Sequence, residues 1–140
     1  MAKATSAALD LICVDPARVQ AIWPHVEPLI ARAARRTGLS HSADIAAETL
    51  QGRGLLWLAC EGRTIRAAAT TVLTRTDAAL VCILTACGGE GMRGFLPLLD
   101  GIEAYARAEG CAALRLYGRK GWARVLDGYR ARHVVLQKEL

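Results

Sequence analysis

The chain has 140 residues, a formal net charge of +5 and a hydrophobic fraction of 53%. This length predicts one domain, residues 1–140, and this hydrophobicity excludes an intrinsically disordered protein. No run reaches the roughly 18 apolar residues that span a bilayer, and no convincing signal-peptide cleavage site follows the start of the chain. We therefore expect a cytoplasmic protein without a membrane segment.

The first part of the chain predicts one strand followed by three helical segments. Residues 9–14 are typical of a short strand, and Asp15-Pro16 is a good helix start, because aspartate caps helices and proline suits the first helical position. Pro24 is expected to kink or split this helix, so that a second piece follows it. Gly38 can end the second piece, and residues 42–51 predict a third helix.

The middle of the chain predicts an antiparallel meander. Residues 55–60, 64–74 and 80–86 are apolar or rich in β-branched side chains, as strands are. The short polar segments 61–63 and 75–77 are typical of tight turns. Three consecutive strands with such short connections pair in antiparallel order.

The second half predicts a crossover and a second strand region. One face of a helix is indicated by apolar residues at helical spacing, namely Phe95, Leu98, Leu99, Ile102 and Ala106. Gly110 ends it, and the strand at 111–117 should pair in parallel with the strand before the helix. A short helix at 121–126 and a last strand at 133–137 complete the order β-α-α-α-β-β-β-α-β-α-β. This order predicts an α/β sandwich around one mixed sheet.

The segment CILTACGGEGMRGFLPLL, residues 82–99, joins a strand to a helix through four glycines. Free backbone N–H groups and the helix dipole at such a turn suit a phosphate, and Arg93 can add positive charge, whereas Glu90 opposes it. Many glycine-rich turns of this kind bind nothing, and both interpretations stay open. The segment lacks the Gly-Lys-Ser/Thr of a P-loop, and the meander before it does not fit a dinucleotide-binding fold.

The cysteines and histidines show no pattern of a metal or covalent site. The five cysteines are an odd number without CxxC spacing, so we expect buried, reduced thiols and no metal, at Cys13, Cys60, Cys82, Cys87 and Cys111. Cys87 adjoins the glycines, but no histidine or asparagine signature accompanies it. We interpret it as a thiol at a strand end.

The meander, the Gly-x-Gly turn with its amphipathic helix, the strand CAALRLYG and the tail GRKGWARVLDGYRARHVVLQKEL together resemble the Gcn5-related N-acetyltransferases, the GNAT family. Three segments are most similar to the small GNAT-like proteins of tailed phages and prophages: LLWLACEG, the block from ACGGEGMRG to WARVL, and DPARVQAIWPHVEPLI. The resemblance covers most of the chain. It implies a GNAT-like α/β fold, a mixed central sheet flanked by helices.

The resemblance also implies a cofactor site. In the family, a Q/R-x-x-G-x-G/A turn holds the pyrophosphate of acetyl-CoA with backbone amides. Here Gly89 and Gly91 take the glycine positions, and Ala86 stands where Gln or Arg is usual. Acetyl-CoA, as acyl donor, is then expected to bind at Cys87, Gly88, Gly89, Gly91, Met92, Arg93 and Gly94.

The catalytic groups that the resemblance implies are incomplete. The family's general acid is often a tyrosine shortly before a Gly-Phe pair, which Gly128-Tyr129 resembles, and counting back places Arg124 there. Arginine does not give up its proton at ordinary pH. Tyr117 and Tyr129 are the candidate substitutes, with packing or surface roles as the alternative. The candidate bases are the glutamates Glu48, Glu61 and Glu90, of which we select Glu48.

Two functions remain. The first is an N-acyltransferase that moves the acetyl group of acetyl-CoA to an unknown amine or protein acceptor. The second is a catalytically degenerate phage or prophage protein that acts in binding or virion assembly, favoured by Ala86 and the missing tyrosine. Exposed sheet edges allow a homodimer. Nucleic-acid binding by the basic, aromatic tail is not favoured, because Trp122 and Val125 are expected to anchor the small helix to the core.

Overall fold

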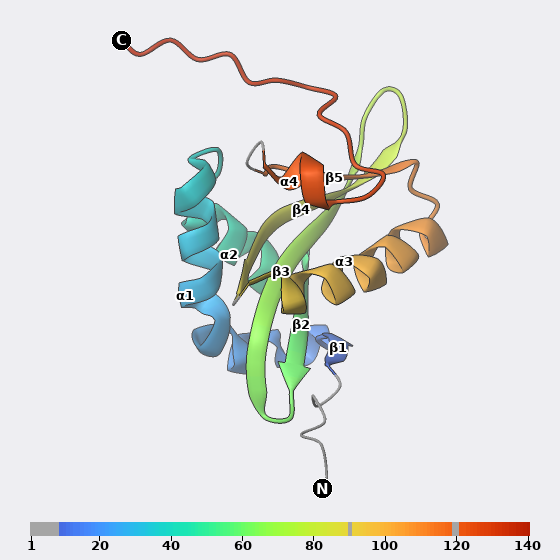
Figure 1. Ribbon diagram of the computed structural model, residues 1–140. Helices are drawn as coiled ribbons and strands as arrows, with labels where there is room; N and C mark the ends of the chain where they lie inside the picture. The colour runs from blue at the N-terminus through green and yellow to red at the C-terminus, as the bar shows by residue number, and fades with distance from the viewer. Residues whose placement is uncertain (1–8, 90, 119–120) are drawn as a thin grey trace, which may run out of the picture.

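The computed structural model describes residues 9–89, 91–118 and 121–140, and of residues 91–93 it describes the backbone only. The described chain forms one five-stranded sheet in the order β1-β2-β3-β4-β5, with helices on both faces (Figure 1). The strands are β1 Asp10–Cys13, β2 Leu55–Glu61, β3 Thr64–Arg75, β4 Leu80–Gly89 and β5 Ala113–Leu116. Strands β1 to β4 pair antiparallel and β5 pairs parallel to β4, which confirms the predicted meander and crossover.

The N-terminal helix starts as predicted but is not split. The side chain of Asp15 accepts a hydrogen bond of 2.9 Å from the backbone N–H of Ala17, which caps the 3-10 turn η1, Pro16–Arg18. Helix α1, Val19–Thr37, then continues through Pro24 and Pro28 to Gly38, whose φ is +67°. Its apolar side packs on the sheet through Val19, Trp23, Val26, Ile30 and Ala34, all buried. This packing outweighs the hydrogen bonds that two prolines remove.

The remaining helices also lie near their predicted positions. Helix α2, Ser42–Leu50, is capped by His41, whose Nδ1 accepts from the N–H of Ala43 at 3.1 Å. Helix α3 spans Gly91–Ala108 and helix α4 spans Trp122–Val125. The glycine-rich segment is therefore not a separate loop. Strand β4 extends through Gly89 and α3 begins at Gly91, so strand and helix take up most of the predicted turn.

The sheet has a hydrophobic core on each face. On one face α1 and α2 pack on alternate strand residues such as Leu56 and Ala68, and on the other α3 packs on their neighbours such as Trp57 and Ala69. Figure 1 shows the same layers, with α1 and α2 on one side of the sheet and α3 on the other. Because successive side chains of a strand point to opposite faces, each strand contributes residues to both cores.

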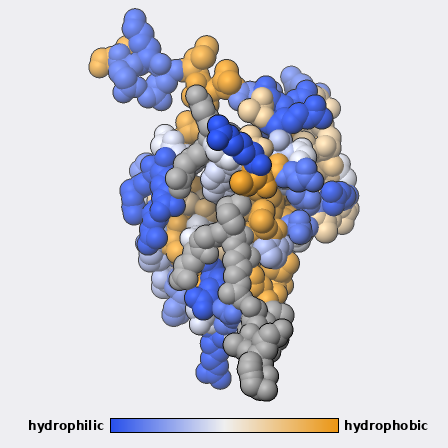
Figure 2. Space-filling model, in the orientation of Figure 1, coloured by the Kyte–Doolittle hydropathy of each residue, from blue (hydrophilic) through white to orange (hydrophobic). Residues whose placement is uncertain are grey.

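Two predictions about the C-terminal region are wrong. Residues 133–137 form no strand, and Val134, Val135 and Leu136 are 79%, 63% and 90% exposed. Figures 1 and 2 show this segment leaving the body of the protein, so its backbone has no neighbouring strand to pair with. Val125 does not anchor α4, since it is 54% exposed, and Leu126 is buried instead.

The cysteines follow the prediction in part. Cys60 and Cys82 are buried and Cys87 and Cys111 are half-buried, whereas Cys13 is exposed because β1 lies at the sheet edge. None of the described helices combines the length and the apolar character that crossing a membrane requires.

Candidate functional site

The site begins with an irregularity in β4. Thr70 of β3 lies opposite Ala86 and Thr71 lies opposite Leu84, so Thr85 is an extra residue, a β-bulge. The bulge reverses the alternation of side chains: Leu84 faces the α3 core, and Ala86, two residues later, faces the α1 core. Bulges of this kind bend a strand and end pairing with a neighbour.

Pairing with β5 stops at the same point. The last pair of the β4–β5 ladder is Leu84 with Leu116, and β4 continues for five residues to Gly89. Within the described chain, no strand pairs with residues 85–89 on the β5 side. This part of β4 therefore presents its backbone polar groups along an open sheet edge.

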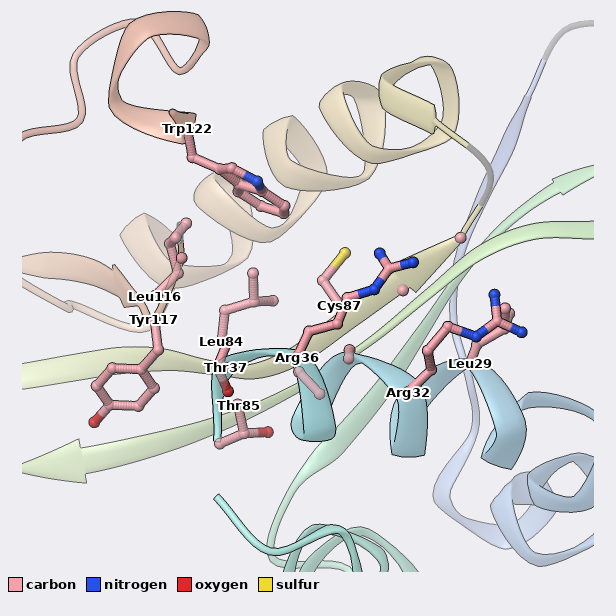
Figure 3. Close-up of a pocket in the computed structure, with 15 residues that line it drawn as sticks. Leu29, Arg32, Arg36, Thr37, Leu84, Thr85, Cys87, Leu116, Tyr117 and Trp122 are labelled. Carbon is pink, nitrogen blue, oxygen red and sulfur yellow. The ribbon is translucent and has the colours of Figure 1, made fainter. Parts of the chain in front are cut away.

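A pocket lies at this opening, between α1, β4, residues 116–118 and Trp122 of α4 (Figure 3). Its lining residues are Leu29, Arg32, Ala33, Arg36, Thr37, Leu84, Thr85, Ala86, Cys87, Gly88, Gly89, Leu116, Tyr117, Gly118 and Trp122. Because both cores contribute to this set, the pocket passes from one face of the sheet to the other through the gap between the strands.

Two lining side chains are held by contacts behind them. The hydroxyl of Thr85 donates to the backbone carbonyl of Thr70 at 3.1 Å and lies 2.6 Å from the Thr70 hydroxyl. The ring of Trp122 packs edge-on against Phe95 of α3, with centroids 4.6 Å apart. This contact confirms that Trp122 anchors α4 to the core. Tyr117 also lines the pocket, and its side chain is freer, since the residue is 43% exposed.

The charged groups among the described lining residues are all positive. Arg32 and Arg36 are the only ionisable side chains among the described lining residues apart from Cys87 and Tyr117. They lie one helical turn apart on α1, and both extend toward the β4 side in Figure 3. Neither forms an ion pair within the described part of the chain. The pocket is therefore electropositive on its α1 side.

Gly88 and Gly89 are explained by close packing. A Cβ atom on Gly88 would lie 2.5 Å from the carbonyl oxygen of Leu29 in α1, and one on Gly89 would lie 2.5 Å from the carbonyl oxygen of Arg66 in β3. Gly94 is buried in α3, where a Cβ would lie 3.3 Å from that of Ala67. Gly88 thus lets α1 approach β4, Gly89 lets β4 lie close to β3, and Gly94 lets α3 approach β3.

The start of α3 adds further donors. Gly91, Met92 and Arg93 form its first turn, where backbone N–H groups have no acceptor inside the helix. Glu90 lies outside the described residues, as do the side chains of Met92 and Arg93. The backbone here has features that the phosphate interpretation requires, namely amides without a partner inside the helix, at the positive end of its dipole.

Cys87 lines the pocket but is not an activated nucleophile. Burial raises the pKa of its thiol to about 12 from an ordinary value of 9.0. The thiol therefore stays protonated near neutral pH, and only the thiolate is a strong nucleophile. This agrees with its interpretation as a thiol at a strand end.

The structure brings together only part of the expected catalytic set. Tyr117 lines the pocket, whereas Tyr129 does not and donates a hydrogen bond of 2.5 Å to Glu103 of α3. Burial, and then this hydrogen bond, raise the pKa of Tyr129. Glu48 of α2 is also absent from the lining. Its backbone carbonyl oxygen accepts hydrogen bonds from the backbone N–H groups of Arg53 and Gly54, at 3.0 and 3.2 Å.

Sequence reasoning did not single out Arg32, Arg36 or Thr85 as site residues. Arg32 and Arg36 carried a signal, because they are four residues apart on one helix with no Asp or Glu three or four residues from either. The bulge at Thr85 carried none, because it depends on the register with β3.

An antiparallel meander followed by a crossover helix and a parallel strand, in one mixed sheet flanked by helices, is the GNAT fold. Solved structures bear this out. A GNAT-family acetyltransferase of Staphylococcus aureus matches with a TM-score of 0.64 and 13% identity, over 95% of this chain and 99% of that one. An acetyltransferase of Trypanosoma brucei matches with 0.64 and 16% identity, over 94% and 99%.

A third structure is an aminoglycoside acetyltransferase from an uncultured soil metagenomic sample, solved with sisomicin. It matches with a TM-score of 0.66 and 10% identity, over 94% of this chain and 95% of that one. No protein-family model and no curated protein matches the sequence. At these identities the likeness establishes the fold of the chain, and its chemistry has to be argued from the pocket.

Proposed function

We propose that the protein is an N-acetyltransferase that uses acetyl-CoA as acyl donor and an amine as acceptor. The observation that carries the proposal is the open edge of β4 at residues 85–89, which lines a pocket and leads into the first turn of α3. An extended ligand that ends in phosphates matches the open strand edge along its length and the first turn of α3 at its end. Its amide groups would bond to the strand edge, and its phosphates would accept from the helix amides.

The residues of the pocket support direct acetyl transfer. The amine nitrogen bonds to the thioester carbonyl carbon, the carbon–sulfur bond breaks, and the amine loses one proton. Tyr117, the phenol among the described lining residues, can give a proton to the departing sulfur and regain one from water, and the amine proton passes to water, because none of the described lining residues is a carboxylate. Holding both reactants in line supplies much of the acceleration. Tyr129 and Glu48 take no part in this scheme.

Calorimetric titration of acetyl-CoA tests the cofactor site. Gly91→Asp places a carboxylate in the first turn of α3, where it suits the helix dipole but repels a phosphate. We expect the wild type to bind acetyl-CoA and desulfo-CoA, and the variant to bind at least about fivefold more weakly, since two like charges about 4 Å apart repel by about 1 kcal/mol or more. Gly91→Asn is the neutral control of the same shape and should bind close to the wild type.

A second candidate is a GNAT-fold protein of tailed phages or prophages that binds a partner without catalysis. It is favoured by Ala86, which is buried against the α1 core, and by Arg124, which is exposed on α4 in the family's usual tyrosine position. Failure of the wild type to bind acetyl-CoA or desulfo-CoA would overturn the enzyme proposal and leave this candidate.

A further inference from the structure

We propose that Arg32 and Arg36 form a binding site for an anionic group on the acceptor, so that the acceptor is an amine that also carries a carboxylate or a phosphate. That the bound molecule is an acetyl acceptor rests on the proposed function. The binding of an anion by the two arginines can be tested separately. The two arginines line the pocket one turn apart on α1, and both are exposed, on the edge of the helix next to Leu29 and Ala33.

The first support is the uncompensated charge. Both guanidinium groups lack an ion pair within the described residues, and no described lining residue is acidic. The sequence around them offers no carboxylate at helical spacing either, because Glu27 is the only acidic residue of α1 and lies five residues before Arg32. Two arginines in such a setting match the planar, two-oxygen geometry of a carboxylate or a phosphate.

The second support is their position relative to the sheet. Arg32 and Arg36 belong to α1, which packs on one face, whereas α3 packs on the other. The first turn of α3, the proposed site for the donor's phosphates, thus starts a helix of the opposite layer. The donor's phosphates would therefore bind on the α3 side of the sheet. The arginines line the pocket on the α1 side, where the acceptor would bind.

The reacting nitrogen would lie between these two regions of the pocket. Thr85 lies at the bulge and Tyr117 at the end of β5, and Thr37 follows Arg36 on α1. An acceptor whose anion meets the arginines would direct its amine toward the gap between β4 and β5. Acceptors whose amine and anion are a few bonds apart fit this arrangement.

The test uses matched small probes and backbone NMR shifts of the labelled protein, with and without desulfo-CoA. Phosphoethanolamine is compared with ethanolamine, and β-alanine with β-alaninamide, because each pair differs only in the anionic group. We expect the anionic member to bind at least tenfold more tightly and to shift the amides of residues 84–89 and 116–118.

Three variants of equal charge change identify the residues. Arg32→Gln and Arg36→Gln should each remove most of the preference for the anionic probe, while Arg35→Gln, on the same turn but outside the pocket lining, should keep it. The affinity for desulfo-CoA should be unchanged in all three. Equal binding of the anionic and neutral probes would overturn the proposal, and so would a loss of desulfo-CoA affinity in the Arg32 and Arg36 variants, which would assign them to the donor.

The outcomes separate this proposal from the proposed function. If desulfo-CoA binds and the probes show no preference, acetyl transfer stands and the anion site fails. If the anionic probes bind through Arg32 and Arg36 and desulfo-CoA does not bind, the anion site stands and the acetyltransferase proposal fails.

Discussion

Tyr117 and Tyr129 are two tyrosines with different surroundings, and the surroundings decide what each hydroxyl can do. Tyr129 is half-buried and its hydroxyl is committed to Glu103, whereas Tyr117 is exposed at the pocket. A hydrogen-bonded phenol against a carboxylate resists ionisation, which burial reinforces. At the scale of single residues, Tyr129 therefore contributes to stability and Tyr117 is available for chemistry.

Phenylalanine variants separate these roles. Tyr117→Phe should lower kcat by about a hundredfold or more, since a general acid typically contributes about 10²- to 10⁴-fold, with little change in stability. Tyr129→Phe should keep kcat within about twofold and lose about 0.5–1.5 kcal/mol of unfolding free energy with its hydrogen bond. The assays are CoA release, with the best amine of the probe set, and urea unfolding. A larger loss of kcat in Tyr129→Phe would reverse the assignment.

The stability difference between the wild type and Tyr129→Phe should depend on pH, and the direction follows from the pKa of Tyr129. The pKa of Tyr129 is raised in the folded protein above its ordinary value of 10.0, so the stability it provides is complete below pH 10. As the pH rises above 10, the unfolded chain loses the proton and the folded chain keeps it. We expect the stability gap between wild type and Tyr129→Phe to narrow there, measured by urea unfolding at pH 8 and pH 11.

At the scale of elements, the contact between α1 and β4 shapes one wall of the pocket. The carbonyl oxygen of Leu29 approaches Gly88 so closely that a methyl group cannot fit without moving backbone. The bulge at Thr85 acts at the same strand, where it turns Ala86 toward α1 and ends pairing with β5. The gap between β4 and β5 is therefore a consequence of how α1 packs on β4 and of the bulge in that strand.

Gly88→Ala tests this packing. The added Cβ would lie 2.5 Å from the Leu29 oxygen, and we expect a loss of about 1–3 kcal/mol in unfolding free energy, as for other overpacked sites. Gly121→Ala is the control, since a Cβ there meets nothing within 4 Å and its φ is −64°. It should be neutral or slightly stabilising. Equal stability of the two variants would mean that α1 lies further from β4.

At the scale of the whole molecule, two cores on one sheet hold the fold, and the C-terminal segment lies outside both. Val26 is 0% exposed in the α1 core, and Val134 is 79% exposed. Valine at these two positions makes a matched comparison of core and tail.

The same substitution should lower the stability at the first position and change it little at the second. Val26→Ala should cost about 1–3 kcal/mol, because it removes buried methyl groups and leaves a cavity. Val134→Ala should change stability by less than about 0.5 kcal/mol. Thermal unfolding of both variants is the measurement. Destabilisation by Val134→Ala would show that the tail packs on the body in solution.

The sequence by itself determined the meander, the crossover helix and the helix limits at Asp15 and Gly38. These features depend on local periodicity, turns and caps, which neighbouring residues specify. Only the tertiary structure decided that residues 133–137 form no strand, because pairing needs a partner strand that local pattern cannot supply. It also decided the bulge at Thr85, the meeting of Arg32, Arg36 and Tyr117 at one pocket, and the distance of Tyr129 from it. These depend on register and packing between segments far apart in the chain.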